Sequence, residues 1–131
     1  MKILIAGSRT IHIPSETMLN DLNDFLNHIG SQKPVTEFIS GGALGVDRCA
    51  EQLAFDLNVP MTINRPDWKT HGKKAGILRN QIMVDACNAA LIYYDGVSKG
   101  TASTIKMLQK TTKPYIIIMI EKEINEEITA Q

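Results

Sequence analysis

Three glycine-containing segments of the chain carry the residue types that bind phosphate. They are Gly7-Ser8-Arg9, Ser40 to Gly45 and Ser98 to Thr101. Glycines let an anion approach backbone N–H groups, hydroxyls donate hydrogen bonds, and a guanidinium matches the geometry of a phosphate. Each segment follows an apolar run and opens a helical pattern, so all three would converge on one ligand. This arrangement predicts a nucleotide or a phosphorylated sugar.

The second segment is the most specific of the three, because three glycines within a few residues exceed what a turn requires. Gly41, Gly42 and Gly45 would let phosphate oxygens reach the N–H groups directly. The segment lacks the Lys-Ser/Thr ending of a P-loop and the spacing of G-x-G-x-x-G. Neither a Walker-type NTPase nor a standard dinucleotide fingerprint is supported.

A charged side chain among apolar helix positions needs a partner. Arg79 falls within one helical pattern whose apolar members are Ala75, Leu78, Ile82, Met83 and Ala86. Its guanidinium either reaches water at the sheet edge or points into the cleft, and we favour the second. Asp47 either complements the dipole of its own helix or accepts ribose hydroxyls and orients Arg79.

Other side chains leave two interpretations open. Trp68, the only tryptophan, lies in a long loop over residues 64–74 and either stacks on a base or anchors that loop. Arg9 is either solvated or bound to phosphate, and Ser98 either caps a helix or adds to an anion site. We see no metal-binding cluster. The expected ligand contacts are Gly7, Ser8, Arg9, Gly41, Gly42, Ala43, Gly45, Asp47, Trp68, Arg79, Asn80, Ser98, Gly100 and Thr101.

Strands and helices must alternate to position these residues. Short apolar runs bounded by turn residues predict buried strands at residues 3–6, 38–39, 61–63, 90–94 and 115–120. Four helical patterns lie between them. The alternation predicts an α/β fold, a Rossmann-like, doubly wound, mainly parallel five-stranded sheet with helices on both faces. We expect one domain over residues 1–120 and an acidic tail over 121–131, either frayed or a short partner-contacting helix.

The composition of the chain limits the classes of function that we expect. The chain has 131 residues and 14 basic against 14 acidic side chains, so its net charge is zero and we do not expect a nucleic-acid partner. Cys49 and Cys87 form no C-x-x-C pair and are expected as buried free thiols in a reducing compartment. No apolar run is long enough for a bilayer. We therefore expect a cytoplasmic protein without membrane contact.

The order of these motifs resembles the YspA-type, cpYpsA-related branch of the SLOG superfamily over residues 1–120. The resemblance is carried by Gly7-Ser8-Arg9, Gly41 to Asp47, Pro66-Asp67-Trp68, Gly72 with Ala75-Gly76, Arg79-Asn80, Met83, Asp85, and Asp95-Gly96 with Ser98 to Thr101. The superfamily includes Lonely Guy phosphoribohydrolases and Smf/DprA-like DNA-processing proteins. The resemblance implies a Rossmann-like fold that binds a nucleotide or nucleotide-derived ligand, and SLOG relatives commonly form homo-oligomers. Because three anion-binding turns converge without a recognisable catalytic set, we expect a sensor, sequestering protein or regulator that binds a nucleotide or ADP-ribose-like molecule. We expect no cofactor.

One departure from the superfamily bears on catalysis. Lonely Guy enzymes carry a turn GGxGTxxE whose glutamate takes part in cleaving a base from a ribose 5'-monophosphate. Thr104 stands at that position here, and a threonine cannot supply a carboxylate. N-glycosidase or phosphoribohydrolase activity would need Asp47, Glu51 or Asp95 instead and is an alternative to ligand binding. DprA-like single-stranded DNA binding is a second alternative.

Overall fold

Five parallel strands form one sheet in the computed structural model, which describes residues 1–121. The strand order is β3-β2-β1-β4-β5, and Ile3 of β1 lies opposite Ala89 of β4. The strands are β1 (Lys2–Gly7), β2 (Glu37–Ser40), β3 (Met61–Ile63), β4 (Ala89–Tyr94) and β5 (Tyr115–Met119). Their continuous apolar runs suit a sheet that is covered on both faces. The predicted doubly wound α/β fold is confirmed.

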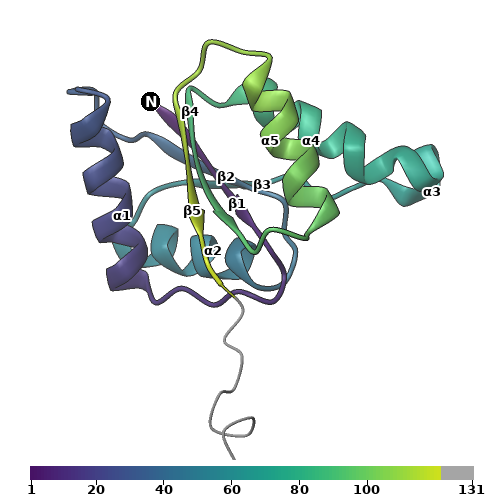
Figure 1. Ribbon diagram of the computed structural model, residues 1–131, viewed down its shortest axis with the longest axis horizontal. Helices are drawn as coiled ribbons and strands as arrows, with labels where there is room; N and C mark the ends of the chain where they lie inside the picture. The colour runs from purple at the N-terminus through teal and green to yellow at the C-terminus, as the bar shows by residue number, and fades with distance from the viewer. Residues whose placement is uncertain (122–131) are drawn as a thin grey trace, which may run out of the picture.

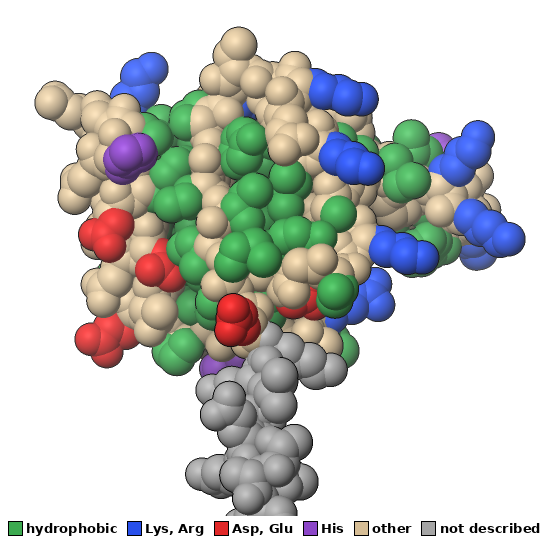
Figure 2. Space-filling model, in the orientation of Figure 1, with side chains coloured by type: hydrophobic (Ala, Val, Ile, Leu, Met, Phe, Trp, Pro, Cys, Tyr) green, Lys and Arg blue, Asp and Glu red, His purple; other side chains and the backbone are tan. Residues whose placement is uncertain are grey.

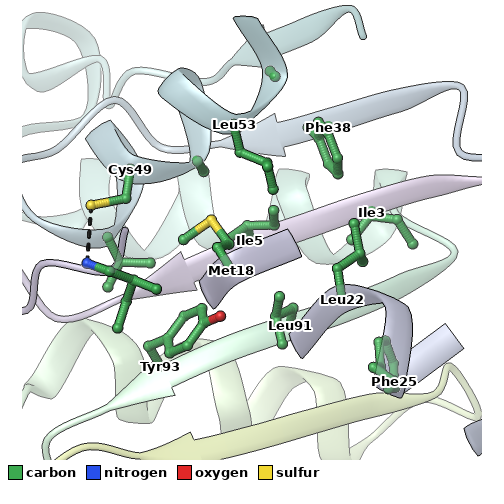
Figure 3. Packing of buried hydrophobic residues seen from close by; sticks show 14 of the residues in the cluster. Ile3, Ile5, Met18, Leu22, Phe25, Phe38, Cys49, Leu53, Leu91 and Tyr93 are labelled. Atoms are coloured by element: carbon green, nitrogen blue, oxygen red, sulfur yellow. Dashed lines mark hydrogen bonds between the residues drawn. The ribbon is translucent and has the colours of Figure 1, made fainter. Parts of the chain in front are cut away.

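Helices cover the two faces of this sheet (Figure 1). The first face packs against α1 (Ser15–His28) and α2 (Val46–Leu57), and the second against α4 (Ala75–Ala86) and α5 (Lys99–Gln109). Because successive strand residues point to opposite faces, Ile3 and Ile5 face α1 and α2, whereas Leu4 and Ala6 face α4 and α5. Figure 3 shows the first of these clusters, including the hydrogen bond from the Ile13 N–H to the Cys49 sulfur at 3.3 Å.

The core-facing side of α4 differs from the predicted one. Its buried residues are Ala75, Asn80, Met83 and Val84, whereas Leu78 and Ile82 are 40% and 56% exposed. Apolar residues occur on two sides of this helix, so periodicity alone cannot select the side that meets the sheet. Arg79 consequently lies at the flank of the buried face and not within an apolar stripe.

The segment predicted as an irregular loop over residues 64–74 contains two short helices. They are α3 (Trp68–His71) and the 3-10 helix η1 (Gly72–Lys74). Asp67 caps α3, since its Oδ1 accepts a hydrogen bond from the Thr70 N–H at 3.1 Å. In Figure 1, α3 projects sideways beyond α4. Short polar helices of this kind carry too few periodic residues to be separated from a loop by sequence.

Both cysteines are buried and unpaired, as predicted. No helix of the described chain has the length and apolar content needed to cross a membrane. The acidic tail predicted for residues 121–131 lies, from residue 122 onward, outside the described residues.

Candidate functional site

The three glycine-containing segments meet at the carboxyl edge of the sheet, and Ser8 joins them. The Ser8 carbonyl accepts hydrogen bonds from the N–H groups of Ile11 and Val46, each at 3.3 Å. Its hydroxyl oxygen accepts one from the Asp95 N–H at 3.3 Å. Ser8 is 1% exposed. This predicted ligand contact therefore binds the protein's own backbone and does not face a ligand.

Gly45 allows the first two segments to approach each other. Its φ is +73°, a conformation that side chains rarely adopt, and an added Cβ would overlap the carbonyl groups of Ser8 and Arg9. Like Ser8, Gly45 builds the site without lining it. Sequence reasoning had no means of separating glycines that admit a ligand from those that admit another loop.

Two adjoining hollows form a continuous groove at this edge. The first, of about 290 Å³, is lined by Ala6, Gly7, Arg9, Ala43, Asp47, Arg79, Asn80, Met83, Ser98, Gly100, Thr101 and Thr104. The second, of about 320 Å³, is lined by Arg9, Gly41, Gly42, Ala43, Arg65, Pro66, Trp68 and Arg79. Because both share Arg9, Ala43 and Arg79, we describe them together as the sheet-edge groove. It runs from the start of α5 to Trp68.

Arg79 links α4 to the segments that follow β2 and β3. Its Nη1 donates hydrogen bonds to the Gly41 carbonyl at 2.8 Å and the Asn64 carbonyl at 3.4 Å, and its Nε donates to Asn80 Oδ1 at 2.8 Å. Burial lowers the pKa of this guanidinium, and the Asp47 carboxylate opposes that shift. Within residues 1–121, the remaining nitrogen, Nη2, makes no hydrogen bond. The guanidinium is thus fixed in place and keeps donors for an anion.

Asp47 is a buried carboxylate in the wall of the groove. Its Oδ2 accepts a hydrogen bond from the Ala43 N–H at 3.0 Å. Burial raises its pKa, while this hydrogen bond and the nearby Arg79 act in the opposite direction. Asp47 does not orient Arg79 by an ion pair, because the only salt bridge among the described residues joins Arg48 and Glu51 at 3.9 Å. Backbone carbonyls perform that role.

Of the three catalytic candidates, only Asp47 lines the groove. Asp95 Oδ1 accepts hydrogen bonds from the N–H groups of Val97 at 2.9 Å and Ser98 at 2.8 Å. These hydrogen bonds lower the pKa of Asp95 and stabilise the turn before α5. Glu51 lies one helical turn beyond Asp47 and does not line either hollow. The sheet-edge groove therefore offers a single carboxylate for acid–base chemistry.

Twelve of the fourteen predicted contacts line the groove: Gly7, Arg9, Gly41, Gly42, Ala43, Asp47, Trp68, Arg79, Asn80, Ser98, Gly100 and Thr101. Arg65 lines it as well, although the sequence-predicted contacts omit it, and its Nη1 donates to the Gly42 carbonyl at 3.2 Å. Its position two residues after β3 is the signal that could have identified it, because the carboxyl ends of parallel strands share one edge.

The side chains around the start of α5 leave its first N–H groups open. Ser98 occupies the capping position but makes no capping hydrogen bond with its side chain. Its hydroxyl instead accepts a hydrogen bond from Thr101 Oγ1 at 3.3 Å, and Thr104 Oγ1 donates to the Gly100 carbonyl at 3.3 Å. Unsatisfied N–H groups at a helix start favour an anion.

Comparison with known proteins identifies the family. No protein-family model matches the sequence. The Gene 61 protein of Mycobacterium phage D29 is 36% identical over 121 residues, which cover 88% of this chain and 94% of the phage protein. The chain belongs to the family of this phage protein. The membership of this chain rests on a match that covers nearly the whole length of both sequences.

Among solved structures, DNA processing protein A from Helicobacter pylori has the same fold. The two structures superpose with a TM-score of 0.65 over 99% of this chain and 72% of the other, at 21% sequence identity. This likeness shows the fold alone. The SLOG superfamily and its YspA-type branch stay predictions. The Helicobacter protein is described as having a unique single-stranded DNA binding mode.

From the net charge we expected no nucleic-acid partner. That exclusion is wrong, because a protein of this fold is described as binding single-stranded DNA. The error lies in using the net charge of the whole chain instead of the distribution of charged side chains. Residues 61–113 carry nine of the 14 basic side chains and only three acidic ones, whereas residues 1–60 carry four basic and seven acidic ones. In Figure 2, most Lys and Arg side chains gather over α5 and α3, and most Asp and Glu side chains over α1.

Proposed function

We propose that this domain binds single-stranded DNA along the sheet-edge groove. The observation that carries the proposal is the lining of one continuous groove by three arginines, Arg9, Arg65 and Arg79, and the exposed ring of Trp68. Proteins that bind single strands combine a positively charged groove for the phosphates with aromatic side chains on which bases stack. The groove contains both components.

The placement of the aromatic ring supports a stacking role. Trp68 is 56% exposed, and a Cβ built on Gly76 would lie 3.6 Å from its ring. The ring therefore rests against the first turn of α4 and leaves much of its surface available. A base could stack on that surface while its phosphate meets Arg65 or Arg79.

The placement of the phosphate donors supports the same function. Arg79 is held by two backbone carbonyls, so little conformational freedom would be lost when an anion binds its free nitrogen. The first N–H groups of α5 lie at the other end of the groove. Donors at both ends fit a ligand with more than one phosphate better than a single ion.

Trp68 provides the test, because it is the only tryptophan and its fluorescence reports on the groove alone. We expect a thymidine oligonucleotide to quench this fluorescence, because a base that stacks on the ring changes the surroundings of the ring. Trp68→Phe should retain a stacking ring and bind with similar affinity, as measured by anisotropy of a labelled oligonucleotide. Unchanged fluorescence together with no retained oligonucleotide would contradict the proposal.

A free nucleotide is a second candidate ligand, and one observation favours it. Asp47 lies in the hollow next to α5, where its carboxylate could accept hydrogen bonds from ribose hydroxyls. AMP or ADP-ribose would then bind in calorimetry and would compete with the oligonucleotide. Release of free base from a nucleoside monophosphate, followed by chromatography, tests the phosphoribohydrolase alternative in the same preparation. Binding of the oligonucleotide without competition by either compound would exclude this second candidate.

A further inference from the structure

The outer face of α5 carries a row of lysines that no part of the described site uses. Lys99, Lys106 and Lys110 are exposed and lie seven and four residues apart, so they share one side of the helix. With a rise of 1.5 Å per residue, the row spans about 16 Å. The three lysines line a surface groove of about 440 Å³ together with Ala102, Ser103 and Met107. We refer to Lys99, Lys106 and Lys110 as the lysine track.

The lysine track is not balanced by acidic neighbours. The sequence of α5, KGTASTIKMLQ, contains no Asp or Glu. Exposed lysines on a helix are commonly paired with acidic residues three or four positions away. Within residues 1–121, none of the three lysines forms a salt bridge. The track is therefore a patch of positive charge that no salt bridge within the described residues compensates.

The lysine track begins where the sheet-edge groove ends. Ser98 and Gly100 line the groove, and Lys99 stands between them in the chain. The buried residues of α5, Thr101, Thr104, Ile105 and Leu108, lie on the opposite side of the helix. A chain of phosphates that leaves the groove at the start of α5 would meet Lys99 first and then Lys106 and Lys110.

We propose that a single DNA strand continues from the sheet-edge groove along the lysine track. This inference rests on the proposed function and adds to it a longer binding site, with the strand running along α5. The occupant is a polynucleotide, because the track is a continuation of a phosphate-binding groove and its charges repeat along a line. Exposed lysines contact phosphates without reading the base, so the track lengthens the site without adding sequence preference.

The experiment compares two double variants that remove the same charge. One is Lys106→Gln with Lys110→Gln, and the other is Lys2→Gln with Lys33→Gln, two exposed lysines in and beside the first half of the sheet. Each is titrated against labelled thymidine oligonucleotides of about five and about twenty nucleotides, lengths that bracket common single-strand site sizes. Anisotropy at several salt concentrations gives the affinity and its salt slope.

We expect the track variant to bind the short oligonucleotide like the wild type and the long one roughly tenfold more weakly. Its salt slope for the long oligonucleotide should fall by about 1.4, since each phosphate contact on a single strand contributes about 0.7. The control variant should match the wild type for both lengths. An equal loss of affinity for the long oligonucleotide in the two variants would overturn the inference and leave the proposed function intact. So would an unchanged affinity of the track variant for it. If the wild type binds neither length, the proposed function itself is wrong, and the track with it.

Discussion

At the scale of a single residue, Arg79 holds two backbone carbonyls and is expected to bind the ligand as well. Arg79→Ala removes hydrogen bonds to the Gly41 and Asn64 carbonyls together with the free donor that faces the groove. We expect it to lower the free energy of unfolding and the free energy of DNA binding, each by about 1.5–3 kcal/mol, the range for hydrogen bonds to charged groups. Urea unfolding and fluorescence titration measure the two quantities.

Arg9→Ala is the matched comparison, because Arg9 is exposed and lines the same two hollows. It should weaken binding and leave stability unchanged. Arg79→Lys restores the charge without the planar fork and should recover binding only in part. If Arg79→Ala retains full stability, the carbonyl contacts described above contribute nothing measurable to the fold.

We expect Asp47 to influence how the stability of the fold responds to pH. Its pKa is raised in the folded state, mainly because burial penalises the charged carboxylate. Protonation of Asp47 therefore stabilises the fold relative to pH 7. This contribution is fully present below the ordinary carboxyl pKa of 3.8 and is lost as the pH rises through the higher pKa of the folded state. We therefore expect Asp47→Asn to be more stable than the wild type at pH 7, with the difference shrinking on acidification, as followed by urea unfolding.

The same substitution separates the two candidate ligands. Asp47→Asn removes a negative charge from the groove, so a DNA strand should bind more tightly at pH 7 and lose the pH dependence that the carboxylate causes. A nucleotide whose ribose hydroxyls are accepted by the carboxylate should instead bind more weakly. Affinity for a thymidine oligonucleotide and for AMP, measured on the same protein, gives opposite changes under the two hypotheses.

At the scale of elements, Lys113 stabilises the end of α4 from another part of the chain. Its Nζ donates hydrogen bonds to the Val84 carbonyl at 2.7 Å and the Asp85 carbonyl at 2.8 Å. Neither carbonyl accepts a backbone N–H within the helix, although the Val84 carbonyl also accepts from the Cys87 thiol at 3.3 Å. A cation also favours the helix C-terminus. Lys113→Met should lower the free energy of unfolding by about 1–3 kcal/mol, seen as a lower melting temperature.

Lys110→Met is the control for that helix-end contact. Lys110 is exposed, and none of the hydrogen bonds described for residues 1–121 involves its side chain. Its loss should change the melting temperature very little. Equal melting temperatures for the two methionine variants would mean that water satisfies the α4 carbonyls as well as Lys113 does.

At the scale of the whole molecule, we expect the separation of charge to govern the proposed association with DNA. Net charge is zero, yet residues 61–113 hold nine basic and three acidic side chains. If the three arginines of the groove and the three lysines of the track each meet a phosphate, the logarithm of affinity should fall against the logarithm of salt with a slope of about −4. Fluorescence titration over a salt series measures this slope. A slope near zero would show that phosphates are not what the domain recognises.

Sequence by itself determined the fold class and most of the residues that line the candidate groove. The strand positions followed from short apolar runs such as residues 90–94, which the structure reproduces within the buried strand β4, because burial on both faces permits almost no other composition. The position of the groove followed from topology, since every loop after a parallel strand opens at the same edge. Twelve predicted contacts line it for this reason.

Only the tertiary structure decided which side of each element meets its neighbours. The periodicity of α4 allowed two apolar sides, and packing buried Asn80 while it exposed Ile82. Ser8 and Gly45 have the residue types of ligand contacts, but the space beside them is filled by neighbouring backbone. Net charge, summed over the whole chain, concealed the gathering of basic side chains over α3 and α5 on one side of the molecule (Figure 2). Local sequence restricts what a residue can do, whereas long-range packing determines what surrounds it.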